Sequence, residues 1–211
     1  MKRVSLETLQ NYIGQLRIYS FVDLVLLFLV VDATRLEIIG CSLLWFSFLI
    51  FLEFIHKDRG RVEWPISAWV VPFILGIVII YKIEIIFFII TAIFYTYKKQ
   101  YPLGLISPII NGLLKVFLVL LISDDINIVI LVFVLMTIRN LAGDFRDAYK
   151  DFSEKITTLP ILFSYKQNTN YIYPLFLAFT SLVWVLMAKI SLWFILLVWF
   201  IQFKTYHLTS R

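Results

Sequence analysis

The residues best suited to chemistry in this chain are three regularly spaced aspartates. Asp144, Asp147 and Asp151 follow a very apolar segment, in the stretch RNLAGDFRDAYKD of residues 139–151. Steps of three and four residues place them on one face of a helix, with Asp151 almost directly above Asp144. Because three like charges repel, their alignment favours a bound divalent cation, and Mg²⁺ shared with a substrate phosphate is the common form. At the edge of an apolar membrane, the pattern predicts a lipid-borne diphosphate as the ligand.

Further polar side chains gather at the ends of apolar segments that we expect to face the same compartment as the aspartates. Asn111 and Lys115 differ from the rest because they lie one helical turn apart inside an apolar segment, and such residues by default face a bundle interior or a cavity. Carboxylates in this set could hold Mg²⁺, and arginine and lysine could bind phosphate oxygens. The set comprises Glu53, Lys57, Asp58, Lys99, Asn111, Lys115, Arg139, Asn140 and Arg146.

Each of these residues also has a purely structural interpretation. The basic ones could simply satisfy the charge bias that multi-span proteins carry on their cytoplasmic side. Glu53 could cap a helix or pair with Lys57, and Lys115 could extend its ammonium group toward water. The three aspartates could lie on a solvated loop helix. A histidine-based metal site is not expected at His56, because no second histidine lies at ligand spacing.

The composition predicts an integral membrane protein. The 211 residues are 61% hydrophobic and 18% aromatic, with a mean hydropathy of +0.90, which is far more apolar surface than a water-soluble domain of this size needs. Residues 1–17 lack a long hydrophobic run and carry apolar residues at helical spacing, so we expect an amphipathic helix on the membrane surface rather than a signal peptide. The single cysteine, Cys41, allows no disulfide framework.

The polarity breaks predict an all-α bundle of about eight transmembrane helices in a single domain of residues 1–211. The expected spans are 18–32, 37–56, 66–81, 83–99, 103–122, 126–143, 171–188 and 190–206. With both termini on one side, only Arg35, Lys82 and Lys189 of the 19 lysines and arginines fall on the other side. This asymmetry predicts a multi-pass protein of the cell membrane with both termini and the candidate site in the cytoplasm. The basic charge then requires no nucleic acid partner.

The motifs of the chain resemble those of the UbiA superfamily of intramembrane prenyltransferases. GDFRDAYKDFSEKITTLPILF, residues 143–163, is similar to the second aspartate-rich motif of that family, including the Thr-Leu-Pro that follows. YTYKKQYPLGLISPIINGL, residues 95–113, resembles the stretch after the fourth span. EFIHKDRGRVEWPIS, residues 53–67, resembles the first aspartate-rich motif by position and by its closing Pro-Ile. It departs from that motif because only Glu53 and Asp58 remain as plausible acids. The second motif departs as well, because Lys155 stands where the family usually has glycine.

The resemblance implies a UbiA-like fold and Mg²⁺-dependent transfer of a prenyl group from an isoprenoid diphosphate to a hydrophobic acceptor within the membrane. The acceptor could be an aromatic acid, a quinone precursor, a glycerophosphate lipid or a porphyrin. The implied Mg²⁺ ligands are Asp144, Asp147, Asp151, Glu53 and Asp58, the diphosphate contacts are Lys57, Lys99, Lys115, Arg139 and Arg146, and the acceptor contacts are Asn111 and Asn140. We expect the acids of the two motifs to converge on one ion or one phosphate.

The altered first motif favours a second hypothesis, in which a catalytically inactive relative keeps the bundle but binds lipid or scaffolds partners. A small transporter would carry paired broken helices in two matching halves, and the sequence shows no such pair.

Overall fold

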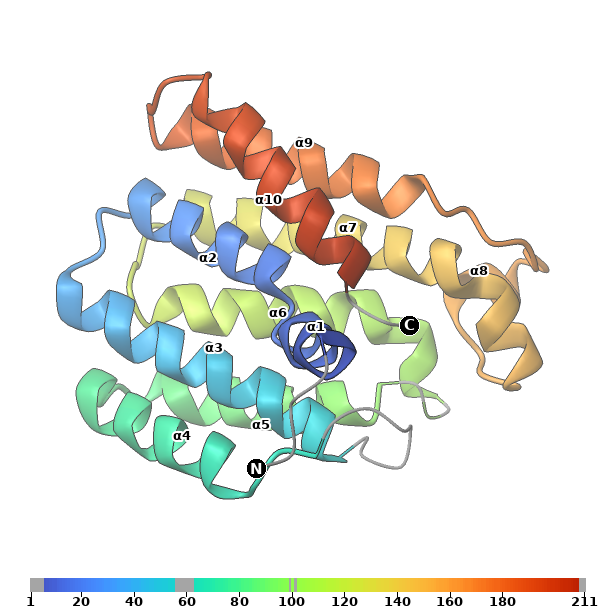
Figure 1. Ribbon diagram of the computed structural model, residues 1–211, viewed down its shortest axis with the longest axis horizontal. Coiled ribbons are helices and arrows are strands. Elements are labelled where there is room, and N and C mark those ends of the chain that lie inside the picture. The colour runs from blue at the N-terminus through green and yellow to red at the C-terminus, as the bar shows by residue number, and fades with distance from the viewer. Residues whose placement is uncertain (1–5, 56–62, 99, 101, 209–211) are drawn as a thin grey trace. The chain divides into compact units, whose positions relative to one another are not determined.

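Every regular element in the part of the chain that the structure describes is helical. The computed structural model describes residues 6–55, 63–98, 100 and 102–208 (Figure 1). Helices are expected for so apolar a chain, because backbone polar groups in an apolar environment must be satisfied within their own segment. The elements are α1 Leu6–Gln15, α2 Ile18–Val30, α3 Arg35–Ile55, α4 Ser67–Ile80, α5 Glu84–Thr96, the 3₁₀ helix η2 Leu103–Ile106, α6 Ser107–Leu120, α7 Ile126–Ser153, α8 Leu159–Leu162, α9 Ile172–Met187 and α10 Phe194–Leu208.

The helical prediction is confirmed, and a helix occupies each of the eight segments predicted as spans. Three stretches are long and apolar enough to cross a membrane, namely Arg35–Ile55, Leu103–Leu120 and Ile126–Ser153. The other five apolar helices have between 13 and 16 residues, fewer than the roughly 20 that a full crossing needs. The number of crossings and the side on which the termini lie therefore stay predictions.

By its internal contacts, the chain divides into two compact units. Unit 1 comprises Met1–Tyr81 and Ser181–Arg211, and unit 2 comprises Lys82–Thr180. The core of unit 1 is built mainly where α3 packs along α4 and where α2 packs along α10. Gly40 and Gly76 allow α3 and α4 to approach closely, since a Cβ atom at Gly40 would lie 2.6 Å from the side chain of Ile80.

The N-terminal helix α1 belongs to unit 1 and packs against α10 and α3. Its last residue, Gln15, is buried and accepts a hydrogen bond of 2.6 Å from the indole nitrogen of Trp64. Tyr12 meets the Trp64 ring edge-on at 4.9 Å between ring centroids. These contacts attach α1 to the segment before α4, and the predicted position of residues 1–17 on the membrane surface stays a prediction.

Unit 2 is organised around α6 and α7, which lie side by side (Figure 1). Pro108 stands in the first turn of α6, where a missing backbone N–H costs nothing. The side chain of Asp125 caps α7 by accepting from the backbone nitrogen of Asn127 at 2.9 Å. At 28 residues α7 is about 42 Å long, which exceeds the roughly 30 Å of a hydrocarbon core. The span predicted to end at residue 143 is therefore continuous with the helix that carries the three aspartates.

Candidate functional site

The three aspartates lie on the last third of α7, on one continuous helix as predicted. Asp151 is fully buried and Asp144 is 5% exposed, while the Asp147 side chain is 27% exposed. A helix whose acids faced solvent would leave all three exposed. The solvated-helix interpretation is therefore wrong for Asp144 and Asp151 within the described structure.

A line of hydrogen bonds, which we call the polar seam, joins α6 to α7 and consists of Ser107, Asn111, Asn140 and Asp144. The Ser107 hydroxyl donates to Oδ2 of Asp144 at 2.8 Å, and Nδ2 of Asn140 donates to the Ser107 carbonyl oxygen at 3.1 Å. One turn further along, Nδ2 of Asn111 donates to Oδ1 of Asn140 at 2.5 Å. Each helix contributes two residues four positions apart, which places both on the face turned toward the other helix.

The polar seam brings together three predicted residues and one that sequence reasoning missed. Asn111, Asn140 and Asp144 were predicted, whereas Ser107 was not. The sequence could have indicated Ser107 by its position one helical turn before Asn111. Ser107, Asn111 and Lys115 are spaced four residues apart and therefore lie on the same face of α6.

Two buried cations also belong to unit 2. Lys115, one turn after Asn111, is 2% exposed and its ammonium nitrogen is shielded from solvent, so the side chain does not extend to water. Arg139 is 6% exposed, and its Nη1 donates to the Thr180 hydroxyl of α9 at 3.3 Å. That hydroxyl in turn donates to the Leu177 carbonyl oxygen at 3.0 Å. Thr180 was not predicted, because nothing in its local sequence distinguishes it from other serines and threonines in apolar helices.

Arg146 binds its own neighbour in the sequence. Its Nε and Nη2 atoms donate to the two carboxylate oxygens of Asp147 at 2.7 and 2.5 Å, a bidentate pair of the strongest kind. The guanidinium carbon also lies 4.8 Å from the centroid of the Tyr173 ring, which fixes the plane of the group. In this arrangement Arg146 holds a carboxylate where a phosphate was predicted.

The donor atoms of α7 fit Mg²⁺ only in part. Among the described residues, no group of three or more histidine, cysteine, aspartate or glutamate side chains is arranged to hold a metal ion. Asp144 and Asp151 are about 10.5 Å apart along the helix axis and their Cα–Cβ bonds tilt the same way, so they cannot turn toward a shared ion. Asp144 and Asp147 are three residues apart on one helix and are therefore neighbours on its surface. Mg²⁺ commonly takes one or two carboxylates with waters and substrate phosphates. The pair fits such an ion once Arg146 leaves Asp147.

The first motif lies largely outside the described residues. Lys57 and Asp58 fall in the segment 56–62, and Lys99 is likewise outside the described part of the chain. Glu53 is buried in unit 1, where Nη2 of Arg17 donates to its Oε1 at 3.3 Å. Arg17 was missed as a partner, since the sequence suggested capping or Lys57 instead. The expected convergence of Glu53 and Asp58 with the aspartates of α7 stays a prediction.

Comparisons of this chain with models of protein families, with curated proteins and with solved structures find no match. The resemblance to the intramembrane prenyltransferases rests on the three sequence stretches that carry it. The geometry of unit 2 adds two buried carboxylates, two buried cations and two carboxamides within one apolar helix assembly. Such a set can bind a polar or anionic group away from bulk water, where each electrostatic contact is strengthened.

Proposed function

We propose that this chain is a Mg²⁺-dependent prenyltransferase that works within the membrane. The donor is an isoprenoid diphosphate and the acceptor is a hydrophobic aromatic or lipid molecule. The observation that carries the proposal is the polar seam of unit 2. Lys115 of α6 and Arg139 of α7 are buried in the same pair of helices. Buried charges are costly in apolar surroundings, so such residues mark a functional site by default.

The proposed reaction breaks the bond between the allylic carbon and the diphosphate oxygen. The diphosphate leaves with the bonding electron pair, the acceptor nucleophile forms the new bond to carbon, and the acceptor proton passes to solvent or to the leaving group. Lys115, Arg139 and Arg146 stabilise the charge that develops on the diphosphate. The apolar walls of the helices protect the allylic cation from water. Asn111 and Asn140 orient the acceptor through their carboxamides.

Mg²⁺, when bound, supplies further neutralisation of the diphosphate charge. Asp144 and Asp147 would share the ion, and Asp151 would make a separate contact. Glu53, Asp58, Lys57 and Lys99 enter the proposal through the sequence resemblance alone. We also propose that the chain crosses the cell membrane eight times, with both termini and the site on the cytoplasmic side.

A second candidate is a catalytically inactive relative that binds lipid or scaffolds partners. It is favoured by the partners that the acids already have: Asp147 holds Arg146, Asp144 holds Ser107, and Glu53 holds Arg17. Acids satisfied by their own chain stabilise the fold without a metal. The two candidates therefore differ in whether these contacts open when a diphosphate and Mg²⁺ arrive.

The deciding experiment uses the full chain purified in detergent and supplied with isoprenoid diphosphates of several lengths, a pool of acceptors and MgCl₂. Released diphosphate and prenylated product are both measured. Asp144→Asn keeps the shape of the side chain but removes its charge, and we expect it to lower release about 100-fold or more. Asp124→Asn, an exposed acid before the other end of α7, is the matched control and should retain full release.

The same experiment separates the two candidates. Release that depends on Mg²⁺ and on Asp144 supports the transferase. An absence of release with every donor and acceptor, in protein whose thermal unfolding shows an intact fold, overturns the transferase and supports the inactive relative.

A further inference from the structure

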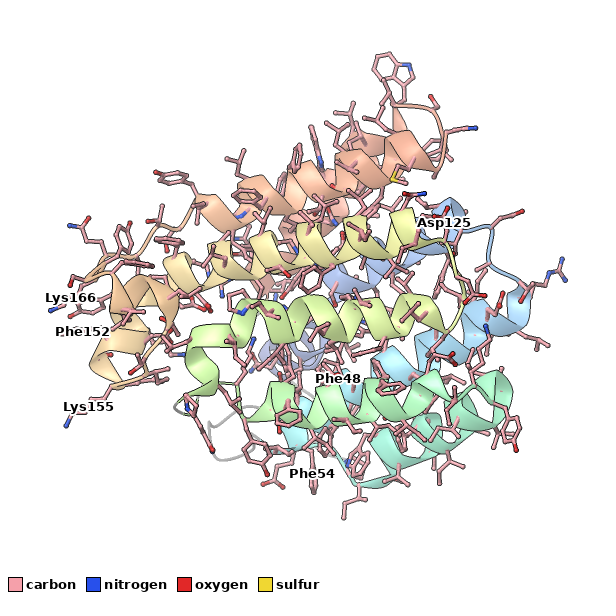
Figure 2. All side chains as sticks on the ribbon, turned by 180° about the vertical axis from the view of Figure 1, so that it is seen from behind. Phe48, Phe54, Asp125, Phe152, Lys155 and Lys166 are labelled. Carbon is pink, nitrogen blue, oxygen red and sulfur yellow. The ribbon has the colours of Figure 1, made fainter. Side chains whose placement is uncertain are left out.

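The end of α7 that carries the aspartates and the segment that follows it, including α8, present exposed apolar side chains to the outside of unit 2. Leu162 and Phe163 are 56% and 78% exposed, and Tyr149 and Phe152 are exposed as well. Lys155 and Lys166 lie among them and are exposed. We call these six residues the distal patch. Figure 2 shows Phe152, Lys155 and Lys166 together at one end of unit 2, with Asp125 at the other end of α7.

The segment that carries part of the distal patch is held firmly against α7. The backbone nitrogen of Tyr149 donates to Oδ1 of Asn168 at 2.8 Å, and the backbone nitrogen of Thr169 donates to the Phe145 carbonyl oxygen at 3.4 Å. Tyr165 hydrogen-bonds Thr169 and packs edge-on against Phe145 with ring centroids 5.2 Å apart. These contacts fix the backbone of the segment, and the fixed backbone keeps Leu162 and Phe163 exposed.

One of the two lysines of the distal patch lies beside an aromatic ring. The ammonium nitrogen of Lys166 lies 4.3 Å from the centroid of the Phe152 ring. Glu154, the acid nearest in sequence, pairs with Lys150 at 4.0 Å, so that pair is neutral and Lys155 and Lys166 set the sign of the surface. Asp124 and Asp125 precede the other end of the same helix. The two ends of α7 thus carry opposite charge.

Apolar and aromatic side chains interleaved with lysine are the side chains found where a membrane protein meets lipid headgroups. Lysine is attracted to anionic lipid, whereas the acidic end of α7 would be repelled by it. The patch lies at the end of α7, which is long and apolar enough to cross a membrane, and a soluble protein partner would leave that position unexplained. The charge and this position together select an anionic lipid surface.

We propose that the distal patch binds the anionic headgroup layer of the membrane. Leu162 and Phe163 insert among the upper parts of the acyl chains, and Lys155 and Lys166 contact lipid phosphates. This inference does not depend on the proposed catalytic activity. It fixes the depth of the C-terminal end of α7, because Phe152 directly follows Asp151 in the sequence.

The test places a fluorescent probe at the patch. Phe163→Cys is labelled with an environment-sensitive dye, while wild type treated with the same dye controls for labelling at Cys41, which is fully buried. The full chain is reconstituted at one copy per nanodisc, in phosphatidylcholine alone or with added phosphatidylglycerol. In each case some lipids carry bromine near the headgroup end of their chains. We expect the brominated lipids to quench the dye, and the quenching to increase with phosphatidylglycerol.

Two matched variants complete the design. Lys155→Gln combined with Lys166→Gln should remove the increase caused by phosphatidylglycerol and leave the basal quenching. A dye at Asp124→Cys should show no such increase. The inference is overturned if the dye at position 163 emits as in water without quenching, or if its quenching is the same with and without anionic lipid.

Discussion

Gly112 controls how closely α6 and α7 can pack, and its replacement by alanine has a predictable cost. An added Cβ would overlap the Thr137 hydroxyl and lie 3.1 Å from both Cδ2 and the backbone carbonyl oxygen of Phe133. The Thr137 hydroxyl, which has no hydrogen-bond partner among the described residues, could rotate away. The carbonyl oxygen cannot move without α7. Alanine at this position therefore forces the two helices apart.

The expected change in the free energy of unfolding for Gly112→Ala follows from two opposing effects. Overpacking a well-filled interface costs about 1–3 kcal/mol. Replacing glycine by alanine inside a helix returns about 1 kcal/mol of backbone propensity. Because the obstacle includes rigid backbone, we take the upper part of the first range and expect Gly112→Ala to destabilise unit 2 by about 1–2 kcal/mol.

Gly143 is the matched control, because it lies on α7 in the same unit. A Cβ at Gly143 would meet the Tyr173 ring at 3.4 and 3.6 Å, which is ordinary van der Waals contact. Gly143→Ala should therefore keep the propensity gain, about 1 kcal/mol of added stability. The two alanine variants should differ by about 2–3 kcal/mol, although both make the same chemical change.

The difference is measured by thermal unfolding of the purified chain in one detergent, followed by tryptophan fluorescence. Thr137→Ala added to Gly112→Ala should recover part of the loss, because it removes the overlapping hydroxyl and leaves the carbonyl. Equal unfolding temperatures for Gly112→Ala and Gly143→Ala would refute the close approach of α6 and α7 on which the polar seam depends.

Two further predictions concern the same unit. In a double-mutant cycle of Ser107→Ala and Asp144→Ala, unfolding free energies should show a coupling of about 1–2 kcal/mol, because a hydroxyl donates to a buried carboxylate; a coupling below about 0.3 kcal/mol would show that the bond contributes nothing. Lys155, two residues beyond the end of α7, has φ 56°, a left-handed conformation that costs a side chain about 1–2 kcal/mol, so Lys155→Gly should raise the unfolding temperature. An unchanged or lower temperature would contradict that backbone assignment.

The helices could be predicted from the sequence because their signal is local. The eight apolar runs are long, and their polarity breaks fall close to the observed helix ends. The end of α7 was missed because the rule for a span stops at the first cluster of charge, whereas α7 continues for ten residues beyond 143. Its helical propensity persists after the apolar run has ended, since alanine, arginine and lysine favour helix as much as leucine does.

Residues of the candidate site could be predicted only where their type and spacing within a single helix were enough to identify them. Asn111, Asn140 and Asp144 are unusual in apolar surroundings and were identified individually. Ser107 required the register of α6 against α7, which no spacing rule provides. The pairing of Arg146 with Asp147 was missed for a different reason, because adjacent residues on a helix do not face each other and only the side-chain rotamers bring them together.

The polar seam and the close approach of its two helices are one structural feature. Short side chains such as serine and asparagine can reach across α6 and α7 only if the backbones are near each other, and Gly112 permits that distance. In an apolar environment, small residues at helix interfaces serve this purpose generally. Gly112, which has no side chain that could bind or react, therefore determines whether Ser107 can reach Asp144. It follows that loss of Gly112 should disturb fold and site together, whereas Asp144→Asn changes the charge of the site and leaves the helix packing in place.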